Sequence, residues 1–335
     1  MNRFAHSSVG RGLTRRHALA LLAGPAMLGA PAARAADDAS TYPTRPIKIL
    51  IGFPPGGSTD GPVRVLAETV SKILKQPVVV ENRTGAGGTL PAVALQATAP
   101  DGYTLGISSL GINRLPYTTG IKWNPASDLS YIIGLTGYAF GVVVPAASPI
   151  RTWADYVAAA KANPVKTTYS TPGVATTNHL TMERIARRAS ITLNHIPYKG
   201  SADSLQALLA GHVDSAAETS AWAPFVRDGK MRLIATWGAK RMTGFPDAPT
   251  LQELGIPLTQ TSAWGLIAPK GLDATIAKRL HDVFKFAMEQ PEFRQALARY
   301  EMEPAYMSSA DFQKFTVQSM RQERDILDAL RLSKQ

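Results

Sequence analysis

A short apolar run, a turn rich in Gly, Ser or Thr, and a segment with helical spacing follow one another repeatedly along this chain. The first such unit has the run Ile47 to Phe53, and apolar residues recur at helical spacing from Val63 to Leu74. Repeated units of this kind predict strand, turn and helix in succession, and therefore an α/β fold with parallel strands.

The units form two series, and this division predicts two α/β lobes. At 335 residues the chain exceeds the usual single-domain size of about 100 to 200 residues. The first series has strands predicted at 47–53, 77–80, 103–108 and 131–135, with a helix at 90–97. The second series has helices predicted at 153–162, 179–189, 202–210 and 222–227, and strands at 166–170, 193–198, 213–217 and 232–236.

Two similar apolar runs are interpreted as strands that cross between the lobes. Phe140 to Val144 ends at a proline, and so does Trp264 to Ala268. This interpretation places residues 42–139 and 264–335 in the first lobe, residues 140–263 in the second lobe, and a ligand cleft between them. Helical spacing at 274–288, 292–300 and 310–330 predicts a helical C-terminal tail, which we expect to pack on the first lobe.

The first 35 residues have the features of an export signal. Arg15 and Arg16 precede the apolar run 18–30, and Ala33-Arg34-Ala35 matches an A-x-A cleavage site. The paired arginines resemble a twin-arginine signal; an ordinary secretory signal is the alternative. We expect cleavage after about Ala35 and a periplasmic mature chain. No later run of about 18 apolar residues could span a bilayer.

Charge and cysteine content exclude several functional classes. Lys and Arg number 36 against 25 Asp and Glu, and five arginines lie in the first 35 residues, so the net charge falls from +11 to 31 − 25 = +6 after cleavage. The remaining charges are interspersed, which argues against a nucleic-acid partner. The absence of cysteine excludes disulfides, thiol catalysis and cysteine–zinc sites. No metal, cofactor or catalytic residue is expected, because the histidines show no metal or triad spacing.

The loop from Phe53 to Asp60 is the first candidate binding element. Its glycines allow close backbone approach, and the following helix presents free N–H groups and the positive end of its dipole. An oxyanion fits such a turn. No lysine follows the glycines, so this is not a nucleotide phosphate loop. Asp60 itself has three possible roles, as a base, as a helix N-terminal charge or as a ligand selector.

The second lobe offers a matching loop from Ser170 to Asn178, which combines a tight turn with four hydroxyls and an amide. Tyr198 and Glu218 end two further strands of this lobe and can face the same cleft. Ser108 and Ser109 end a strand of the first lobe, but without the G-x-S-x-G elbow of a hydrolase nucleophile.

Several short motifs, in their order and spacing, resemble one known family. They are Tyr42-Pro-x-Arg-Pro-Ile, the Pro-Gly-Gly-x-x-Asp loop ending at Asp60, Glu81-Asn-Arg-x-Gly-Ala-Gly-Gly88, Asp101-Gly-Tyr-Thr-Leu105, His195-Ile-Pro-Tyr-Lys-Gly200, Phe245-Pro-Asp-Ala-Pro-Thr250 and Trp264-Gly-Leu-Ile-Ala-Pro269. The mature chain resembles the tripartite tricarboxylate transporter receptors, also called Bug or TctC-type periplasmic solute-binding proteins.

The resemblance implies a type II periplasmic-binding-protein fold that closes around a small aliphatic or aromatic carboxylate and delivers it to membrane transporter subunits, without catalysis. It also implies that backbone amides of both loops grip the carboxylate. The binding residues predicted from pattern and resemblance together are Phe53, Pro55, Gly56, Gly57, Ser58, Asp60, Ser108, Ser109, Thr171, Gly173, Ala175, Thr176, Thr177, Asn178, Tyr198 and Glu218.

Two departures from the family pattern flank the expected cleft. The stretch 110–117 lacks the usual Asn-Pro-x-Leu-Tyr segment, and Glu218-Thr219 replaces a typical Asp-Asn pair. We therefore expect Asp60, Tyr198 and Glu218 to determine selectivity, in a monomeric protein. Two alternatives remain: a sensory co-receptor for a membrane kinase, and a periplasmic enzyme that uses Asp60 or Glu218 as a base.

Overall fold

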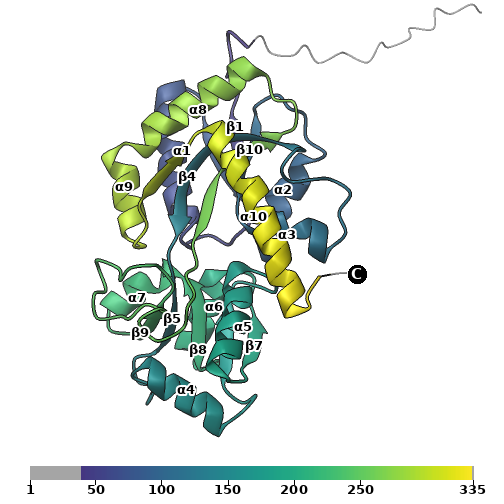
Figure 1. Ribbon diagram of the computed structural model, residues 1–335. Coiled ribbons are helices and arrows are strands. Elements are labelled where there is room, and N and C mark those ends of the chain that lie inside the picture. Colours follow the sequence, from purple (N-terminus) through teal and green to yellow (C-terminus); the bar gives the residue numbers. More distant parts are fainter. Residues whose placement is uncertain (1–38, 334–335) are drawn as a thin grey trace, which may run out of the picture. The chain divides into compact units, whose positions relative to one another are not determined.

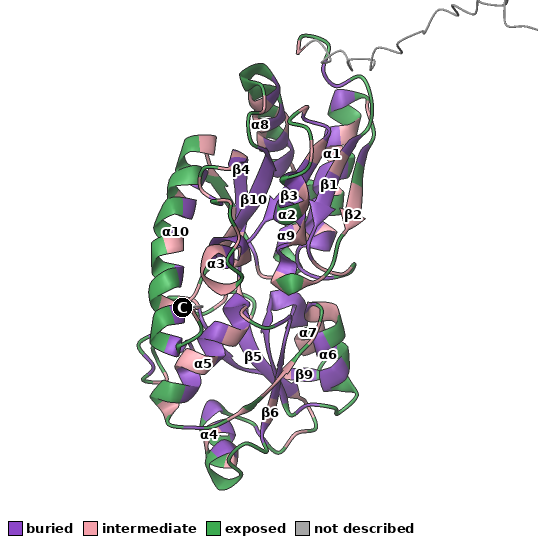
Figure 2. Ribbon diagram, turned by 90° about the vertical axis from the view of Figure 1, so that its right-hand side faces the viewer, coloured by how far each residue is buried: buried purple, intermediate pink, exposed green. Residues whose placement is uncertain are grey.

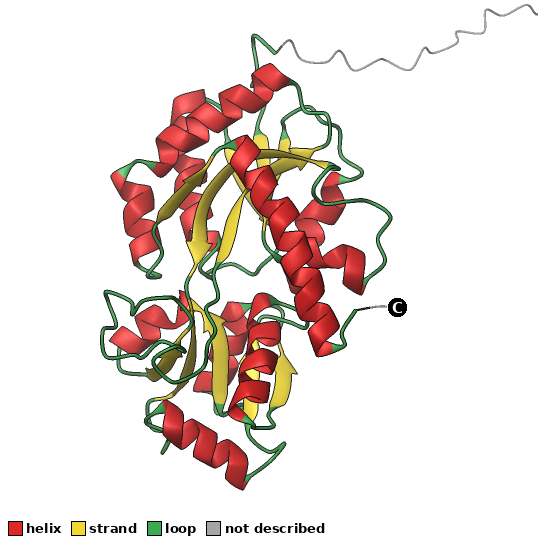
Figure 3. Ribbon diagram, in the orientation of Figure 1, coloured by secondary structure: helices red, strands yellow, loops and turns green. Residues whose placement is uncertain are grey.

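The computed structural model describes residues 39–333. The predicted export signal and its cleavage site at Ala35 lie outside the described residues. Within the described part the chain is mixed α/β, with two separate β-sheets that are each flanked by helices (Figures 1 and 3).

The first sheet has six strands in the order β11-β4-β10-β3-β1-β2. Three of them are parallel, as the repeated strand–helix units predict: β1 (Ile47–Ile51), β2 (Val78–Asn82) and β3 (Thr104–Ser108). The other three run antiparallel to their neighbours: β4 (Leu129–Tyr138), β10 (Ser262–Pro269) and β11 (Pro304–Met307). Helices cover both faces of this sheet, which explains why β1 and β3 are buried almost throughout.

The second sheet has five strands in the order β7-β6-β8-β5-β9. β6 (Thr168–Thr171) is parallel to β7 (Asn194–Pro197) and to β8 (Ser215–Thr219). β5 (Phe140–Pro145) runs antiparallel to β8 and to β9 (Met231–Thr236). We call the residues around the first sheet the first lobe, and those around the second sheet the second lobe. The exact lobe boundaries inferred from the sequence stay a prediction.

The chain passes between the two sheets twice. Only Ala139 separates β4 from β5, so the first passage is nearly a continuous strand. The second passage follows β9 and ends where Ser262 of β10 pairs with Tyr138 of β4. The two apolar runs noted in the sequence each lie within one sheet, directly after a passage. Aromatic rings pack around both passages, with Phe140 stacked on Trp237 at 5.3 Å between ring centroids.

The helices of the first lobe are α1 (Asp60–Leu74), α2 (Leu90–Leu95), α3 (Gly111–Thr118), α8 (Ala274–Met288), α9 (Pro291–Ala298) and α10 (Ser309–Leu330). Those of the second lobe are α4 (Trp153–Ala162), α5 (Thr177–Ala189), α6 (Ser201–Leu209) and α7 (Ala223–Arg227). Two short 3₁₀ segments, η1 (Ala86–Gly88) and η2 (Ser220–Trp222), complete the elements. The sequence did not predict α3 or β11.

The C-terminal helix α10 contacts both lobes, which goes beyond the expected packing on the first lobe. Near its start, Ser309 donates a hydrogen bond to the carbonyl of Ile132 in β4 at 2.5 Å. Near its end, Leu327 and Leu330 form a buried cluster with Leu180 of α5. Arg187 of α5 also donates to the last carbonyls of α10. Figure 2 shows α10 extending beside α3 as far as α5.

We predict that Leu327→Ala lowers the free energy of unfolding by about 2 to 5 kcal/mol, because a fully buried side chain leaves a cavity between α10 and α5. The matched control is Val317→Ala on the exposed side of the same helix, which we expect to change it by less than about 0.5 kcal/mol. Urea unfolding measures both, and equal effects would show that α10 does not pack as described.

Candidate functional site

One cavity lies between the two lobes. It is lined by residues from loops that follow strands of both sheets. Its empty volume, including its mouth, is about 540 Å³. We call it the central cavity. Its lining residues are Phe53, Pro54, Gly57, Ser58, Thr59, Gly87, Ser109, Gly111, Arg114, Tyr138, Phe140, Pro172, Thr176, Thr177, Asn178, Ser201, Ala202, Thr219 and Ser262.

The loop between β1 and α1 brings the N-terminus of α1 to this cavity. Gly57, Ser58 and Thr59 line it, and α1 begins at the next residue. The first N–H groups of a helix have no intrahelical acceptor and carry the positive end of the dipole. In α1, Pro62 has no N–H and that of Gly61 donates to the carbonyl of Gly57 at 3.3 Å, so the donors at this end are those that precede Gly61. The side chain of Thr59 is held in place, because its Oγ1 hydrogen bonds to the hydroxyl of Tyr138 at 2.6 Å.

Asp60 holds this loop in shape from behind. Its carboxylate accepts hydrogen bonds from the backbone N–H of Gly56 at 3.1 Å, Nε of Arg64 at 2.9 Å and Nδ2 of Asn82 at 2.8 Å. Burial alone would raise the pKa of Asp60, but the hydrogen bonds from Arg64, Asn82 and Gly56 outweigh it and lower that pKa. Of the three roles that the sequence left open, this geometry favours an ionised carboxylate that shapes the loop.

The loop between β6 and α5 brings a second helix N-terminus to the same cavity. Thr176 caps α5, since its Oγ1 accepts from the N–H of His179 at 3.4 Å and donates to the carbonyl of Gly173 at 2.7 Å. Thr177 and Asn178, the first residues of the helix, line the cavity. Asn178 is fixed by a bond from Nδ2 to the carbonyl of Ala217 in β8.

Two stacked histidines support this second loop from its outer side. The rings of His179 and His195 lie 4.1 Å apart between centroids. His179 Nδ1 accepts from the N–H of Ala175 at 3.1 Å, and His195 Nε2 hydrogen bonds to Oγ1 of Thr171 at 2.7 Å. Burial lowers the pKa of both rings, that of His195 to about 3, so both are neutral at pH 7. Ala175 has a φ of +56°, which these contacts help to maintain.

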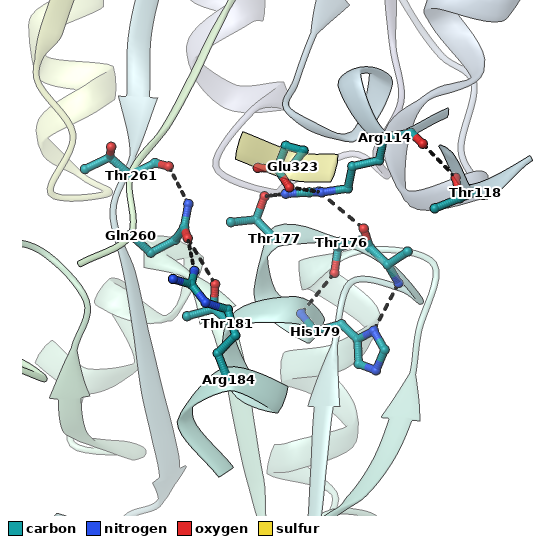
Figure 4. Close-up of polar contacts among 11 residues, drawn as sticks. Arg114, Thr118, Thr176, Thr177, His179, Thr181, Arg184, Gln260, Thr261 and Glu323 are labelled. Atoms are coloured by element: carbon teal, nitrogen blue, oxygen red, sulfur yellow. Dashed lines mark hydrogen bonds and ion pairs between the residues drawn. The ribbon is translucent and has the colours of Figure 1, made fainter. Parts of the chain in front are cut away.

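Arg114 of α3 joins three segments at the edge of the cavity, and sequence reasoning missed it. Its Nε donates to Glu323 of α10 at 2.6 Å, Nη1 to the carbonyl of Ala175 at 3.2 Å and Nη2 to Oγ1 of Thr177 at 2.9 Å. The side chains of Arg114 and Glu323 are each only 4% exposed. Figure 4 shows Arg114 reaching from the first lobe to the start of α5.

Glu218 is the penultimate residue of β8 and is buried behind the wall of the cavity. Its Oε2 accepts a hydrogen bond from Ser201 Oγ at 2.6 Å, and its pKa is raised by burial to about 8. Tyr198 is also set back from the cavity: its N–H donates to the carbonyl of Thr171, and its ring packs against the apolar core of the second lobe.

The predicted site residues therefore fall into two groups. Those that line the central cavity are Phe53, Gly57, Ser58, Ser109, Thr176, Thr177 and Asn178. Those outside its lining are Pro55, Gly56, Asp60, Ser108, Thr171, Gly173, Ala175, Tyr198 and Glu218. Tyr138, Phe140 and Ala202 also line it and were not predicted, whereas Pro54 and Pro172 lie within the two predicted loops without having been singled out.

The arrangement can bind an anion with neutral donors. Two helix N-termini from different lobes and several hydroxyls surround the cavity, whereas Arg114, its charged lining residue, is already paired with Glu323. Within residues 39–333, no three His, Asp or Glu side chains come together as a metal site would require. Over the same residues, no helix has the length and apolar character needed to cross a membrane.

The fold and the inter-lobe cavity together define a two-lobed solute-binding protein. Structural comparison agrees: the periplasmic binding protein BugD superposes with a TM-score of 0.83 at 25% identity, over 88% of this chain and 100% of BugD. R. palustris Rpa4515 with adipate gives a TM-score of 0.81 at 26% identity, over 86% and 97% of the two chains.

Sequence comparison identifies the family. The family model described as tripartite tricarboxylate transporter family receptor matches residues 63–332. The UPF0065 protein in the gbd 5' region of Cupriavidus necator is 54% identical, over 96% of this chain and 99% of its own length. Protein BugT of Bordetella pertussis is 35% identical, over 78% and 81%. The chain belongs to the tripartite tricarboxylate transporter receptor family, also called the Bug family.

We predict that Arg114→Met lowers the free energy of unfolding by about 3 to 5 kcal/mol, because Glu323 then stays buried without its cation. The double variant Arg114→Met/Glu323→Leu should be more stable than the single variant, since it removes both charges. Urea unfolding compares the three proteins. A single variant as stable as wild type would contradict the buried pair.

We predict that Asp60→Asn destabilises the protein at pH 7 by about 1 to 3 kcal/mol, through loss of charge-assisted hydrogen bonds. The pKa of Asp60 is lower in the folded than in the unfolded protein, so its contribution is present above the ordinary value of 3.8 and is lost as pH falls below it. Unfolding at about pH 7 and about pH 3 measures the difference. A difference in unfolding free energy between wild type and Asp60→Asn that is larger at low pH than at neutral pH would contradict the prediction.

Proposed function

We propose that this chain is a periplasmic receptor that captures a small carboxylate in the central cavity and delivers it to a tripartite tricarboxylate-type membrane transporter. One observation carries the proposal: the N-termini of α1 and α5, from different lobes, line one cavity. Backbone N–H groups at helix N-termini are ready-made donors for an anion. Two such ends around one carboxylate can bind both of its oxygens.

The walls favour an organic acid over an inorganic anion. Phe53, Pro54, Tyr138 and Phe140 give the cavity apolar and aromatic surface next to the donors. An aliphatic or aromatic acid fits this combination, with its carboxylate at the helix ends and its carbon atoms against the rings. The similar structure of R. palustris Rpa4515 with adipate supports a carboxylate ligand.

Hydrogen bonds that join the lobes link binding to lobe closure. Ser58 of the first lobe and Thr219 of the second are 2.9 Å apart between hydroxyl oxygens. On the far side of the passages, Arg227 Nη1 donates to the carbonyl of Arg299 at 2.9 Å. These bonds form only when the lobes approach each other, so a ligand that contacts both helix ends favours the closed state.

Delivery to a transporter rests on the family, and location rests on the predicted export signal. The alternative was an enzyme that uses Asp60 or Glu218 as its base. Neither carboxyl group lines the cavity, and that of Asp60 is engaged by Arg64, Asn82 and Gly56. No specific feature of the described residues favours a sensory co-receptor.

Thermal unfolding with a panel of acetate, malate, adipate, citrate and benzoate tests the proposal. An acid present at 100 times its dissociation constant should add about 2.7 kcal/mol to the free energy of unfolding. Flat melting temperatures across the panel would contradict carboxylate binding.

We predict that Gly57→Val weakens binding of the stabilising acid at least about tenfold, because the side chain blocks access to the helix end. The fold should be retained, since a Cβ at Gly57 would meet only the carbonyl of Pro54 at 3.8 Å. Gly57→Ala should have a smaller effect in the same direction. Calorimetric titration of the three proteins gives the comparison, and undiminished affinity in Gly57→Val would remove this loop from the site.

A further inference from the structure

A chain of three hydroxyls connects the central cavity to Glu218. Ser58 Oγ lies 2.9 Å from Thr219 Oγ1, which lies 3.2 Å from Ser201 Oγ, and Ser201 Oγ lies 2.6 Å from Oε2 of Glu218. Ser58, Thr219 and Ser201 all line the cavity. We call these three residues the hydroxyl chain. Its first member comes from the first lobe and the other two from the second, so the chain is complete only when the lobes are together.

Each hydroxyl has a single hydrogen, and therefore the chain has a direction. If Glu218 is ionised, it can only accept, so Ser201 donates to it, Thr219 donates to Ser201 and Ser58 donates to Thr219. The cavity is then offered only oxygen lone pairs by these side chains. If Glu218 is protonated, it can donate to Ser201, and every hydrogen bond along the chain reverses. Ser58 is then free to donate to a ligand.

The surroundings of Glu218 favour the protonated form. The residue is fully buried, and its Oε1 has no hydrogen-bond partner among the described residues. An ionised carboxylate with one such oxygen is strongly disfavoured in a buried position. Burial accordingly raises the pKa of Glu218 to about 8, against smaller opposing effects of the hydroxyls of Ser201 and Ser204 and the backbone of Thr219.

No charged group on the elements packed against β8 compensates for the negative charge of an ionised Glu218. Titratable or charged groups on the elements packed against β8 are Asp203 on α6, Tyr169 on β6, and His179, Glu183 and three arginines on α5, whereas β5 and η2 carry none. Asp203 is exposed, and none of these groups is among the causes of the shifted pKa of Glu218. Across the cavity, Arg114 is paired with Glu323.

We infer that the protonation state of Glu218 sets the direction of the hydroxyl chain and thereby the affinity of the central cavity for a carboxylate. Glu218 is a positioning residue that acts on the ligand through Ser58, and this inference rests on the proposed function. When an anion binds while Glu218 is ionised, one proton passes from solution to Oε2 of Glu218, and the reversed chain lets Ser58 donate to the ligand carboxylate. Anion and proton then bind together.

The proposed coupling between carboxylate binding and protonation of Glu218 fixes how affinity changes with pH. Because the bound anion favours protonated Glu218, ligand binding raises the pKa of Glu218 further. Affinity is therefore full below about pH 8 and falls as pH rises above it. The two histidines do not titrate in this range, since their pKa values are lowered from 6.5.

The experiment is calorimetric titration with whichever acid of the panel stabilises the protein most, in two buffers that differ in ionisation enthalpy. Between about pH 7 and about pH 10 we expect wild-type affinity to fall about tenfold, which corresponds to a pKa shift of about one unit on binding. At about pH 9, proton uptake on binding should be clearly measurable.

Glu218→Gln is the conservative control, because its amide remains neutral and can donate to Ser201 at every pH. It should bind with wild-type affinity near pH 7, with affinity independent of pH and with no proton uptake. Thr219→Val interrupts the hydroxyl chain but keeps the carboxyl group of Glu218. It should also lose the proton uptake, while infrared spectroscopy still detects a protonated carboxyl band that Glu218→Gln lacks.

The outcomes separate this inference from the proposed function. Binding by wild type without proton uptake near pH 9, or the same uptake in Glu218→Gln, overturns the role of Glu218 and leaves the receptor function standing. If no acid of the panel binds to wild type, the receptor function fails, and the role of Glu218 fails with it.

Discussion

Two helix N-termini meeting at one cavity is the constraint on which the rest of the site depends. The first backbone N–H groups of a helix need acceptors from outside the helix, and the aligned peptide dipoles make the N-terminus of each helix positive. α1 and α5 belong to different lobes, and residues at or beside both starts line the central cavity. An anion placed between them satisfies donors from both lobes at once, which gives it a reason to hold the lobes together.

Most of the polar residues nearby act by fixing these two ends. Asp60, with Arg64 and Asn82, holds the first loop from behind, and the stacked histidines hold the second. Arg114 adds a bond across the lobes to Thr177 while its charge is balanced by Glu323. In the proposed function, neutral backbone donors recognise the charge of the ligand, and the side chains supply shape and orientation.

The sequence predicted the α/β fold, the two-lobed architecture and the two loops that reach the central cavity because these depend on local patterns. Glycine turns, apolar runs and helical spacing are visible in short windows, as in the segment from Ile47 to Leu74. α3 escaped because Gly111 begins it and Pro116 lies inside it, both of which argue against a helix. β11 is a partly exposed edge strand of only four residues that begins with a proline, which is too short and too weak a pattern to indicate a strand.

The partners of individual polar residues could not be predicted from the sequence. Arg114 and Glu323 are 209 positions apart, and nothing local in either segment indicates the other. In the sequence Asp60 and Glu218 were both carboxylates expected beside the cleft, yet the pKa of Asp60 is lowered and that of Glu218 is raised. The difference arises from packing, since Asp60 has three hydrogen-bond donors around it, whereas one oxygen of Glu218 has no partner among the described residues.

A crystal structure with the stabilising acid bound tests the central claim most directly. The account predicts carboxylate oxygens within about 3 Å of backbone nitrogens at the starts of both α1 and α5. It predicts the carbon atoms of the acid against Phe53 and Phe140. An acid held by only one lobe, or by side-chain charges elsewhere in the protein, would contradict it.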